Sequence, residues 1–432
     1  MSVTDAHSGP ETLRKPADFV ITTPECLKRF YDHIRTDNKV KKPSRTIRLA
    51  FQLLTKLRSG TVNMVLPDGQ KVTFNGSQDG PEGTVIIHND KAIRRFMTAG
   101  HLGFCEAYLA GEWDSPDIAT FFEVILINAG EFRKTFSGKA WVRFLSNLIH
   151  KTKKNTVRGS RKNIYAHYDL GNDFYKTWLD ESMTYSSALF LNDNDSLERA
   201  QENKYRKMAD ALDLKPGMSV LEIGCGWGGF SEYLATNHNV QVTAITISEE
   251  QYDYAVQRMR TAGLENRVTI LLQDYRMVKG SYDRLASIEM LEAVGEDYWP
   301  VFFNRIHDLL EPGGCAVIQT ITIGDEHFER YRNHADYIQR YIFPGGMLPS
   351  PSALSKQIEL AGLQSGTPFS FGRDYARTLN KWNETFQKNW NEIRTMNFDS
   401  KFKRLWELYL CYCEAGFRDG TTDVIQIPIT KH

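Results

Sequence analysis

A glycine-rich turn in the middle of the chain has the composition of a nucleotide-binding loop. The apolar run 220–223 contains one acid, Glu222, and leads into Gly224, Gly226 and Gly228. Glycine permits backbone conformations that other residues avoid, and it lets a ligand approach the main chain closely. A helix that begins just after such a turn offers unpaired N–H groups to that ligand. The segment therefore predicts a site for a cofactor that contains a nucleotide.

Two kinds of cofactor compete for this turn. The same glycines, with Gly229, match the Gly-x-Gly-x-x-Gly pattern of nicotinamide dinucleotide enzymes. However, Glu222 precedes the first glycine, where S-adenosylmethionine enzymes hold the amino-acid part of their cofactor. The polar stretch 246–251 does not resemble a simple strand-end acid for a dinucleotide ribose, and 273–275 suits contacts to an adenine ring. We favour S-adenosylmethionine, and a tight turn without a ligand stays open as the alternative.

Alternating strands and helices must position this turn. Apolar runs predict strands at 219–223, 241–246, 268–272, 284–288 and 315–322, with a late edge strand at 424–429. Amphipathic segments predict helices at 230–236, 249–261 and 298–310. This alternation predicts an α/β domain from 163 to 432.

A smaller α/β unit is expected at 41–131. The turn residues at 67–70 predict a hairpin, and apolar segments at 91–99 and 118–128 predict helices. The unit contains no recognisable catalytic cluster. We therefore expect an accessory domain that docks on a membrane or on a partner subunit. The partner subunit could be a second copy of the chain, which would give a homodimer. Residues 1–40 are polar at their start and are expected to form a flexible tail.

A basic connector is expected at 132–162. Ten Lys or Arg residues and no acid lie between Phe132 and Asn163, and apolar residues recur among them at helical spacing. One interpretation is a helix that packs on its own protein and exposes a solvated basic face. The other is a surface that contacts an anionic membrane.

Composition limits the function classes. Acidic and basic side chains are equal in number, at 53 each, so a nucleic-acid partner is not expected. The six cysteines are scattered without zinc spacing, which predicts reduced thiols, a cytoplasmic location and no metal site. No run of about 18 apolar residues occurs, so a lipid substrate would be approached from the inner face of the membrane.

Several ordered motifs in the second half of the chain resemble the cyclopropane-fatty-acyl-phospholipid synthases and the related mycolic acid cyclopropane synthases. They lie at 166–174, 183–188, 221–229, 246–248, 273–276, 292–295, 341–350, 374–379 and 413–418. The resemblance covers about 163 to the C-terminus and extends more weakly to 107–113. It implies a Rossmann-like class I methyltransferase domain, whose mainly parallel seven-stranded sheet has an antiparallel edge strand.

The resemblance also implies a reaction. In that family the double bond of an unsaturated acyl chain attacks the methyl group of S-adenosylmethionine, and a carbocation forms at the other alkene carbon. A bound bicarbonate then removes a proton from the new methyl group, and a cyclopropane ring closes. The implied substrate is an unsaturated acyl chain of a membrane phospholipid. The cofactor-binding residues expected from the turn and the resemblance are Tyr185, Ser186, Glu222, Gly224, Gly226, Gly228, Thr246, Ser248, Gln251, Asp274, Tyr275 and Arg276.

The family's bicarbonate-binding set maps onto Ser187, Glu292, Gln319, Ile321 and Tyr375. Ser187 stands where many members have cysteine, and Gln319 replaces a histidine. A serine and a glutamine amide can still donate hydrogen bonds to an anion, but glutamine does not titrate near neutral pH. These departures leave the product open between a cyclopropane and a methyl- or methylene-branched chain.

Other residues have a weaker assignment. Cys413 matches a cysteine proposed as catalytic in relatives, although a small buried thiol is the alternative. We expect His167 to shape a cofactor lid, and the insertion at 323–350 to form part of an acyl tunnel wall. Glu289 is expected to be structural or to support the residues that contact the ligands. A non-catalytic lipid-binding protein and a small-molecule methyltransferase are the competing functions.

Overall fold

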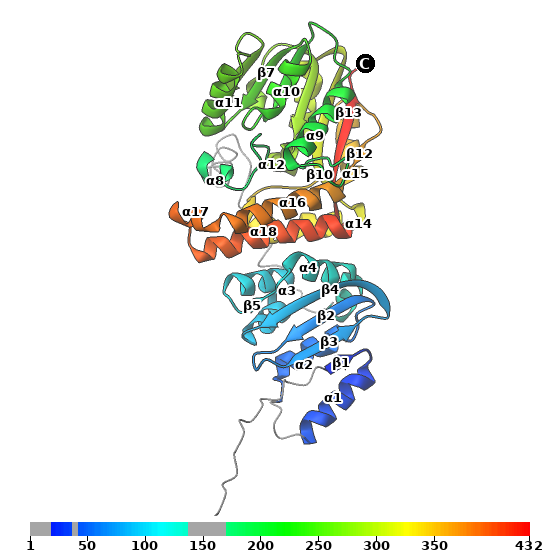
Figure 1. The fold of residues 1–432 in the computed structure, drawn as a ribbon. Helices are drawn as coiled ribbons and strands as arrows, with labels where there is room; N and C mark the ends of the chain where they lie inside the picture. Colours follow the sequence, from blue (N-terminus) through cyan, green and yellow to red (C-terminus); the bar gives the residue numbers. More distant parts are fainter. Residues whose placement is uncertain (1–18, 37–41, 137–169) are drawn as a thin grey trace, which may run out of the picture.

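The structure is a computed structural model that describes residues 19–36, 42–136 and 170–432. Two sheets organise the chain, with a pair of long helices between them (Figure 1). The predicted connector at 132–162 lies almost wholly outside the described residues, as does His167. None of the described helices is both long and apolar enough to cross a bilayer.

The N-terminal sheet has the strand order β1-β3-β2-β4-β5. Its strands are β1 (Phe19–Ile21), β2 (Ser59–Val65), β3 (Lys71–Asn75), β4 (Gln78–Ile87) and β5 (Trp113–Asp114). Its helices are α1 (Pro24–Thr36), α2 (Arg45–Leu54), α3 (Lys91–Leu109), α4 (Ile118–Ile127) and α5 (Ala129–Phe136). The predicted hairpin is confirmed, because β2 and β3 pair antiparallel and Gly69 takes a positive φ of 85° in the turn.

The prediction of a flexible tail over 1–40 is wrong for residues 19–36. Strand β1 pairs parallel with β3, and helix α1 buries Leu27, Phe30 and Ile34. These three residues recur at helical spacing and form one apolar face on α1. The residues around this short apolar stripe are polar. The overall composition of the segment therefore led to the prediction of a tail.

The C-terminal sheet has the order β11-β13-β10-β9-β6-β7-β8, and β12 also pairs with β13. Its strands are β6 (Ser219–Ile223), β7 (Gln241–Thr246), β8 (Val268–Leu272), β9 (Tyr282–Ile288), β10 (Leu310–Ile323), β11 (Gln364–Ser365), β12 (Phe369–Ser370) and β13 (Thr422–Thr430). Its helices include α8 (Asn172–Lys176), α9 (Leu197–Leu212), α10 (Gly229–Asn237), α11 (Glu249–Thr261), α12 (Leu291–Val294), α13 (Trp299–Leu309), α14 (Asp325–Asn333) and α15 (Pro351–Leu360).

This arrangement confirms the α/β class with a mostly parallel sheet. Strands β6 to β10 run parallel, and β13 pairs antiparallel with β10, as expected. However, β13 is not the edge, because the two-residue strands β11 and β12 pair along its outer side. Such short strands have too few residues to show an alternating pattern.

Helices α16 (Gly372–Lys388) and α18 (Ser400–Asp419) lie side by side between the two sheets, and the short α17 (Trp390–Thr395) joins them (Figure 1). Helix α18 binds the N-terminal unit through Arg404, whose guanidinium lies 2.7 Å from Asp114. The hydroxyl of Tyr108 donates to Glu407 at 2.8 Å. One hydrophobic core runs from the N-terminal sheet into α16 and α18. The N-terminal unit is therefore packed onto the C-terminal domain and shares one hydrophobic core with it.

Candidate active site

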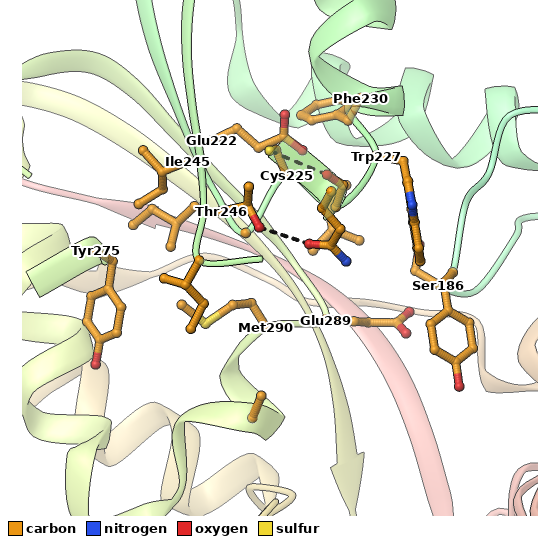
Figure 2. A pocket seen from close by; sticks show the side chains of 18 of the residues that line it. Ser186, Glu222, Cys225, Trp227, Phe230, Ile245, Thr246, Tyr275, Glu289 and Met290 are labelled. Atoms are coloured by element: carbon orange, nitrogen blue, oxygen red, sulfur yellow. Dashed lines mark hydrogen bonds between the residues drawn. The ribbon is translucent and has the colours of Figure 1, made fainter. Parts of the chain in front are cut away.

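The glycine turn lies at the carboxyl end of β6 and lines a pocket with β7 and β9 (Figure 2). Gly224, Gly226 and Gly228 have φ values of 81°, 53° and 82°. A Cβ atom at Gly224 would lie only 2.9 Å from the side chain of Met290. Both the backbone conformation and the close approach therefore require glycine at this position.

Glu222 is buried at the base of this pocket, where its carboxylate accepts a hydrogen bond from the hydroxyl of Ser231. Burial raises the pKa of Glu222 to about 7, because an apolar environment disfavours the charged form. A buried acid at this place suits the ammonium group in the amino-acid part of S-adenosylmethionine.

Most of the predicted cofactor residues line this pocket. They are Tyr185, Ser186, Glu222, Gly224, Gly226, Thr246, Gln251, Asp274, Tyr275 and Arg276. Gly228 and Ser248 are the exceptions. Gly228 forms the left-handed N-cap of α10, and the hydroxyl of Ser248 caps α11 by accepting from the N–H of Gln251. Helix capping is therefore a sufficient reason for a glycine at 228 and a serine at 248.

The pocket is polar at one end and aromatic at another. Asp274 and Arg276 form a bidentate ion pair, with N–O distances of 2.9 and 2.6 Å, so the Asp274 carboxylate is already engaged. The buried hydroxyl of Tyr275 makes no hydrogen bond within the described residues. A buried polar atom of this kind is normally satisfied by a ligand or water. The residues present therefore fit an adenosyl cofactor that carries a charged amino-acid group.

Glu289 has a more central position in the site than the sequence analysis gave it. It follows β9 in a left-handed conformation, with φ 49°, which non-glycine residues rarely adopt. Its Oε1 accepts hydrogen bonds from the N–H of Ser187 at 2.8 Å and from Nε2 of Gln319 at 2.7 Å. Its Oε2 accepts from the hydroxyl of Tyr375 at 2.6 Å. The prediction allowed a structural or a supporting role for Glu289, and these three hydrogen bonds place its carboxylate at the centre of the predicted set. A carboxylate at the end of a central strand was the available indication.

This arrangement bears directly on the predicted bicarbonate. Ser187, Gln319 and Tyr375 were expected to hold an external anion, and all three direct a donor at Glu289 instead. A second anion among these donors would meet the charge of Glu289 at short range. The residues present therefore do not fit bicarbonate, because a carboxylate of the chain occupies its expected place.

Glu292 lies close to this centre on α12. Its Oε1 accepts from the N–H of Ile321 and from the hydroxyl of Thr320, while its buried Oε2 has no hydrogen-bond partner among the described residues. Burial and the neighbouring charge of Glu289 raise the pKa of Glu292 to about 8. Glu289 and Glu292 thus form a carboxyl pair in which Glu292 is mainly protonated at neutral pH.

A large apolar cavity adjoins the cofactor pocket. It has a volume of about 1860 Å³, and its walls come from α1 to α5 of the N-terminal unit as well as from α14, α16 and α18. Tyr185, Glu289 and Ala293 line both the cavity and the cofactor pocket. The two spaces therefore meet beside Glu289.

The remaining predicted catalytic residues divide between this cavity and the protein interior. Glu292, Ile321, Tyr375 and Cys413 line the cavity. Ser187 and Gln319 are completely buried, and each donates a hydrogen bond to Glu289. Burial raises the pKa of the Cys413 thiol far above its usual range, which keeps it protonated. A protonated thiol is a poor nucleophile, so the structure favours packing as the role of Cys413.

Lys204 is a residue that the sequence analysis missed. It is fully buried on α9, and its Nζ donates to the hydroxyl of Ser186 at 2.6 Å. Burial lowers its pKa to about 8, while the carboxylates of Glu289 and Glu222 act in the opposite direction. A buried cation thus lies directly behind the cofactor pocket.

Comparisons with known proteins agree with this geometry. A model of the family described as mycolic acid cyclopropane synthetase matches residues 155–427. The chain is 37% identical to tuberculostearic acid methyltransferase UfaA1 of Mycobacterium tuberculosis, over 84% of this chain and 86% of that protein. It is 35% identical to cyclopropane-fatty-acyl-phospholipid synthase of Escherichia coli K12, over 83% of this chain and 90% of that protein.

A solved structure gives the same result. Mycolic acid cyclopropane synthase CmaA1 complexed with SAH and CTAB aligns with a TM-score of 0.59 and 30% identity, over 63% of this chain and 98% of that one. The SAH bound in that structure is what S-adenosylmethionine becomes after methyl transfer. Together with the glycine turn and the buried Glu222 of this chain, it identifies S-adenosylmethionine as the methyl donor. The chain belongs to the mycolic acid cyclopropane synthetase family and is an S-adenosylmethionine-dependent methyltransferase.

Proposed function

We propose that the enzyme transfers the methyl group of S-adenosylmethionine to a double-bond carbon of an unsaturated acyl chain in a membrane phospholipid. The observation that carries this proposal is the junction of the cofactor pocket with the apolar cavity at Tyr185, Glu289 and Ala293. A methyl donor seated on the glycine turn would there face an apolar chain.

The size of the cavity supports a lipid over a small molecule. Its volume of about 1860 Å³ exceeds the range of roughly 300–1,000 Å³ that is usual for small-molecule pockets. Its lining is mainly aliphatic and aromatic, as an acyl chain requires. The Escherichia coli relative is named for a phospholipid substrate, which supports the same class here.

Glu289 is the proton acceptor in this proposal. S-adenosylmethionine supplies an electrophilic methyl group. The π electrons of the alkene form the new carbon–carbon bond, the sulfur–methyl bond breaks, and the other alkene carbon becomes cationic. Glu289 then takes a proton that this cation releases, while the rings of Tyr185 and Tyr375 limit access of water. Three hydrogen bonds hold the Glu289 carboxylate in place for this step.

The product that we propose is a methyl- or methylene-branched chain. After a hydride shifts from the methylated carbon to the cationic carbon, loss of a proton from the methyl group gives a methylene branch. Loss of a proton from a neighbouring chain carbon instead gives a methyl-branched alkene. The similarity to a tuberculostearic acid methyltransferase supports this branch. A cyclopropane, formed when the proton leaves without a hydride shift, is the second candidate and is supported by the Escherichia coli relative.

One experiment tests the proposal. The full-length protein is incubated with methyl-labelled S-adenosylmethionine and vesicles of a dioleoyl phospholipid, with distearoyl vesicles as the saturated control. We expect S-adenosylhomocysteine to form only with the unsaturated lipid, and NMR of the product to show a branched chain. A cyclopropane signal would select the second candidate. Equal release with both lipids would refute attack by a double bond.

A further inference from the structure

A pair of buried glutamines joins two neighbouring strands beside Glu289. Gln319 of β10 stands directly opposite Gln426 of β13 in the antiparallel register of these strands (Figure 1). Residues that stand opposite each other in such a pair direct their side chains to the same face of the sheet. Nε2 of Gln426 donates to Oε1 of Gln319 at 3.0 Å. This contact links the strand that holds Glu289 to the last strand of the chain.

Gln319 holds Glu289 at two points. Its main-chain oxygen accepts from the N–H of Glu289 at 2.8 Å, and its Nε2 donates to the Glu289 carboxylate at 2.7 Å. The second contact depends on which end of the amide faces Glu289. An amide nitrogen stabilises an ionised carboxylate, whereas an amide oxygen repels it and can accept a hydrogen bond only from the protonated acid. The orientation of this amide therefore affects which form of Glu289 is favoured.

Gln426 permits only one orientation of the Gln319 amide. If Gln319 were reversed, its nitrogen would face the nitrogen of Gln426, and two donors would oppose each other. Gln426 is itself held, because its Nε2 also donates to the main-chain oxygen of Lys204 at 3.3 Å. A reversed Gln426 would set its oxygen against these two acceptor oxygens. The N–H groups therefore point in one direction, from Gln426 to Gln319 and from Gln319 to Glu289.

The other end of the Gln426 amide is unpaired. Its Oε1 is buried and has no hydrogen-bond partner within the described part of the chain. Buried polar atoms are normally paired, so an unpaired one needs an explanation. Here the side chain keeps its two donor contacts while its acceptor stays unpaired. This arrangement supports a function for the contact that Gln426 donates.

The charged and titratable groups around Glu289 come from several elements. Burial raises the pKa of Glu289, whereas Tyr375 of α16 and Lys204 of α9 lower it. Glu292 of α12 is the neighbouring acid, and its own pKa is raised by burial and by Glu289. Gln319 acts on Glu289 in the same direction as Tyr375 and Lys204, but its amide is neutral at every pH. Its influence therefore depends on the orientation of that amide.

We propose that Gln426 is a positioning residue, which fixes the amide of Gln319 so that its N–H is directed at the Glu289 carboxylate. This inference rests on the proposed function only in that Glu289 is the base there. Gln426 lines neither the cofactor pocket nor the apolar cavity and acts through Gln319. A carboxylate that faces a fixed donor stays ionised at lower pH, and it can therefore accept a proton from the methylated chain.

The pKa of Glu289 provides a test that needs no turnover. The full-length protein is labelled with ¹³C at the glutamate carboxyl carbons, and NMR follows their titration with pH. The signal of Glu289 is the one that is absent from Glu289→Gln. Gln426→Met keeps the length of the side chain but has no donor, so the amide of Gln319 can reverse and accept from protonated Glu289. We expect the pKa of Glu289 to rise by about one pH unit or more, as loss of a hydrogen bond to a charged group allows.

A double-variant cycle shows whether Gln426 acts through Gln319. Gln319→Met removes the donor to Glu289 and should raise the pKa of Glu289 at least as far as Gln426→Met does. Addition of Gln426→Met to Gln319→Met should change this pKa no further, because the amide between the two residues is gone. An unchanged pKa in Gln426→Met, or a double variant in which the two effects add, would overturn the proposal.

Gln339→Met is the matched control. Gln339 is also a buried glutamine whose amide donates to a main-chain oxygen, that of Gly346 at 3.2 Å. This variant should keep the wild-type pKa of Glu289. If Gln426→Met does not fold, Gln426→Asn takes its place, because it retains an amide that is too short to reach Gln319. A merely structural role for Gln426 would lower the unfolding temperature and leave the pKa of Glu289 in place, which would also overturn the proposal.

Turnover of the same variants separates this inference from the proposed function. We measure kcat/KM against pH with dioleoyl phospholipid vesicles, and its acidic limb should move with the pKa that NMR gives for Glu289. A raised pKa with an unmoved limb, or with no turnover in any variant, would leave the role of Gln426 standing and refute the proposed role of Glu289. An unchanged pKa together with normal turnover would do the reverse.

Discussion

The hydroxyl of Tyr375 on α16 donates a 2.6 Å hydrogen bond to the carboxylate of Glu289 at the end of β9. This contact joins the helix that borders the lipid cavity to the strand that borders the cofactor pocket. Since Glu289 lines both spaces, its carboxylate can take a proton from a chain that has just been methylated. In the proposed reaction, the base is therefore a carboxylate of the protein itself.

Glu289→Gln should remove this base while it keeps the size of the side chain. We expect kcat to fall by about 10²–10⁴-fold, the usual contribution of a general base. Cofactor affinity, measured by calorimetry, should stay close to that of the wild type. Glu296→Gln, which changes an acid outside both spaces, is the control. A Glu289→Gln enzyme with wild-type kcat would exclude Glu289 as the base.

The pH profile should respond to the Tyr375 contact. Burial raises the pKa of Glu289, and the hydrogen bond from Tyr375 lowers it again. Glu289 must be ionised to accept a proton, so kcat/KM should rise with pH through the pKa of Glu289. Tyr375→Phe removes the donor, raises this pKa and should move the acidic limb of the kcat/KM profile to higher pH. A lower rate with an unmoved limb would contradict this coupling.

Removal of bicarbonate should leave the activity unchanged. The donors expected to hold bicarbonate are engaged by Glu289. Turnover in degassed buffer under argon should therefore equal turnover after bicarbonate is added back. The Glu289→Gln variant provides a second comparison, since any rescue of it by added bicarbonate would show that an external anion can enter the vacated place. A wild-type enzyme that stops in degassed buffer would show that bicarbonate is required after all.

The glycine turn and the strands around it were predictable because their patterns are local. A run such as 219–223 followed by glycines specifies a strand and a turn without reference to distant residues. Glu289 was not predictable in the same way. Its role depends on a left-handed backbone and on donors that lie 102, 86 and 30 residues away in the chain. Sequence spacing carries no information about such contacts.

The lipid cavity shows the same limit on a larger scale. Its wall combines helices of the N-terminal unit with α18, and apolar side chains such as Phe122 and Tyr412 are indistinguishable from core residues in the sequence. Gly228 and Ser248 show an ambiguity of another kind. Glycine and serine next to a cofactor loop fit ligand binding and helix capping equally well, and here they are caps.

Cofactor affinity should depend on pH through Glu222. Burial raises the pKa of Glu222 to about 7, so its carboxylate is mainly protonated at pH 6 and mainly ionised at pH 8. The cofactor is cationic, and its affinity should therefore rise between these two values. Glu222→Gln should bind about tenfold or more weakly at pH 8, since a hydrogen bond to a charged group is lost, and should lose most of the pH dependence. A wild-type dissociation constant that is equal at pH 6 and pH 8 would contradict this assignment.

The cavity wall can be tested at Phe343. This residue follows the π-helical turn Ile338–Ile342, lines the cavity and packs against the ring of Tyr409 at 6.0 Å. Phe343→Asp places a carboxylate in an apolar wall and should abolish lipid turnover, whereas it should spare cofactor binding because Phe343 does not line the cofactor pocket. Phe343→Leu keeps the wall apolar and is the control, with thermal unfolding to confirm that both variants fold. Unimpaired turnover by Phe343→Asp would remove this segment from the acyl-chain wall.

Lys204 should influence the base from behind the cofactor pocket. Its ammonium group is fully buried against Ser186, and its charge lowers the pKa of both Glu289 and Glu222. Lys204→Met keeps most of the side-chain volume but removes the charge. The pKa of Glu289 should then rise further, so the acidic limb of the kcat/KM profile should move to higher pH. The groups that face Glu289 and remain in this variant are Tyr375, Gln319, Ser187 and Glu292.

Lys207→Met is the control for this variant. Lys207 lies on the same helix, where it is exposed and stacks on the ring of Phe369. Its loss should leave the pH profile in place. A purely structural role for Lys204 would lower the unfolding temperature of Lys204→Met and reduce the rate equally at every pH. A displaced limb therefore distinguishes an electrostatic role from packing, because only a changed charge alters the pH at which Glu289 ionises.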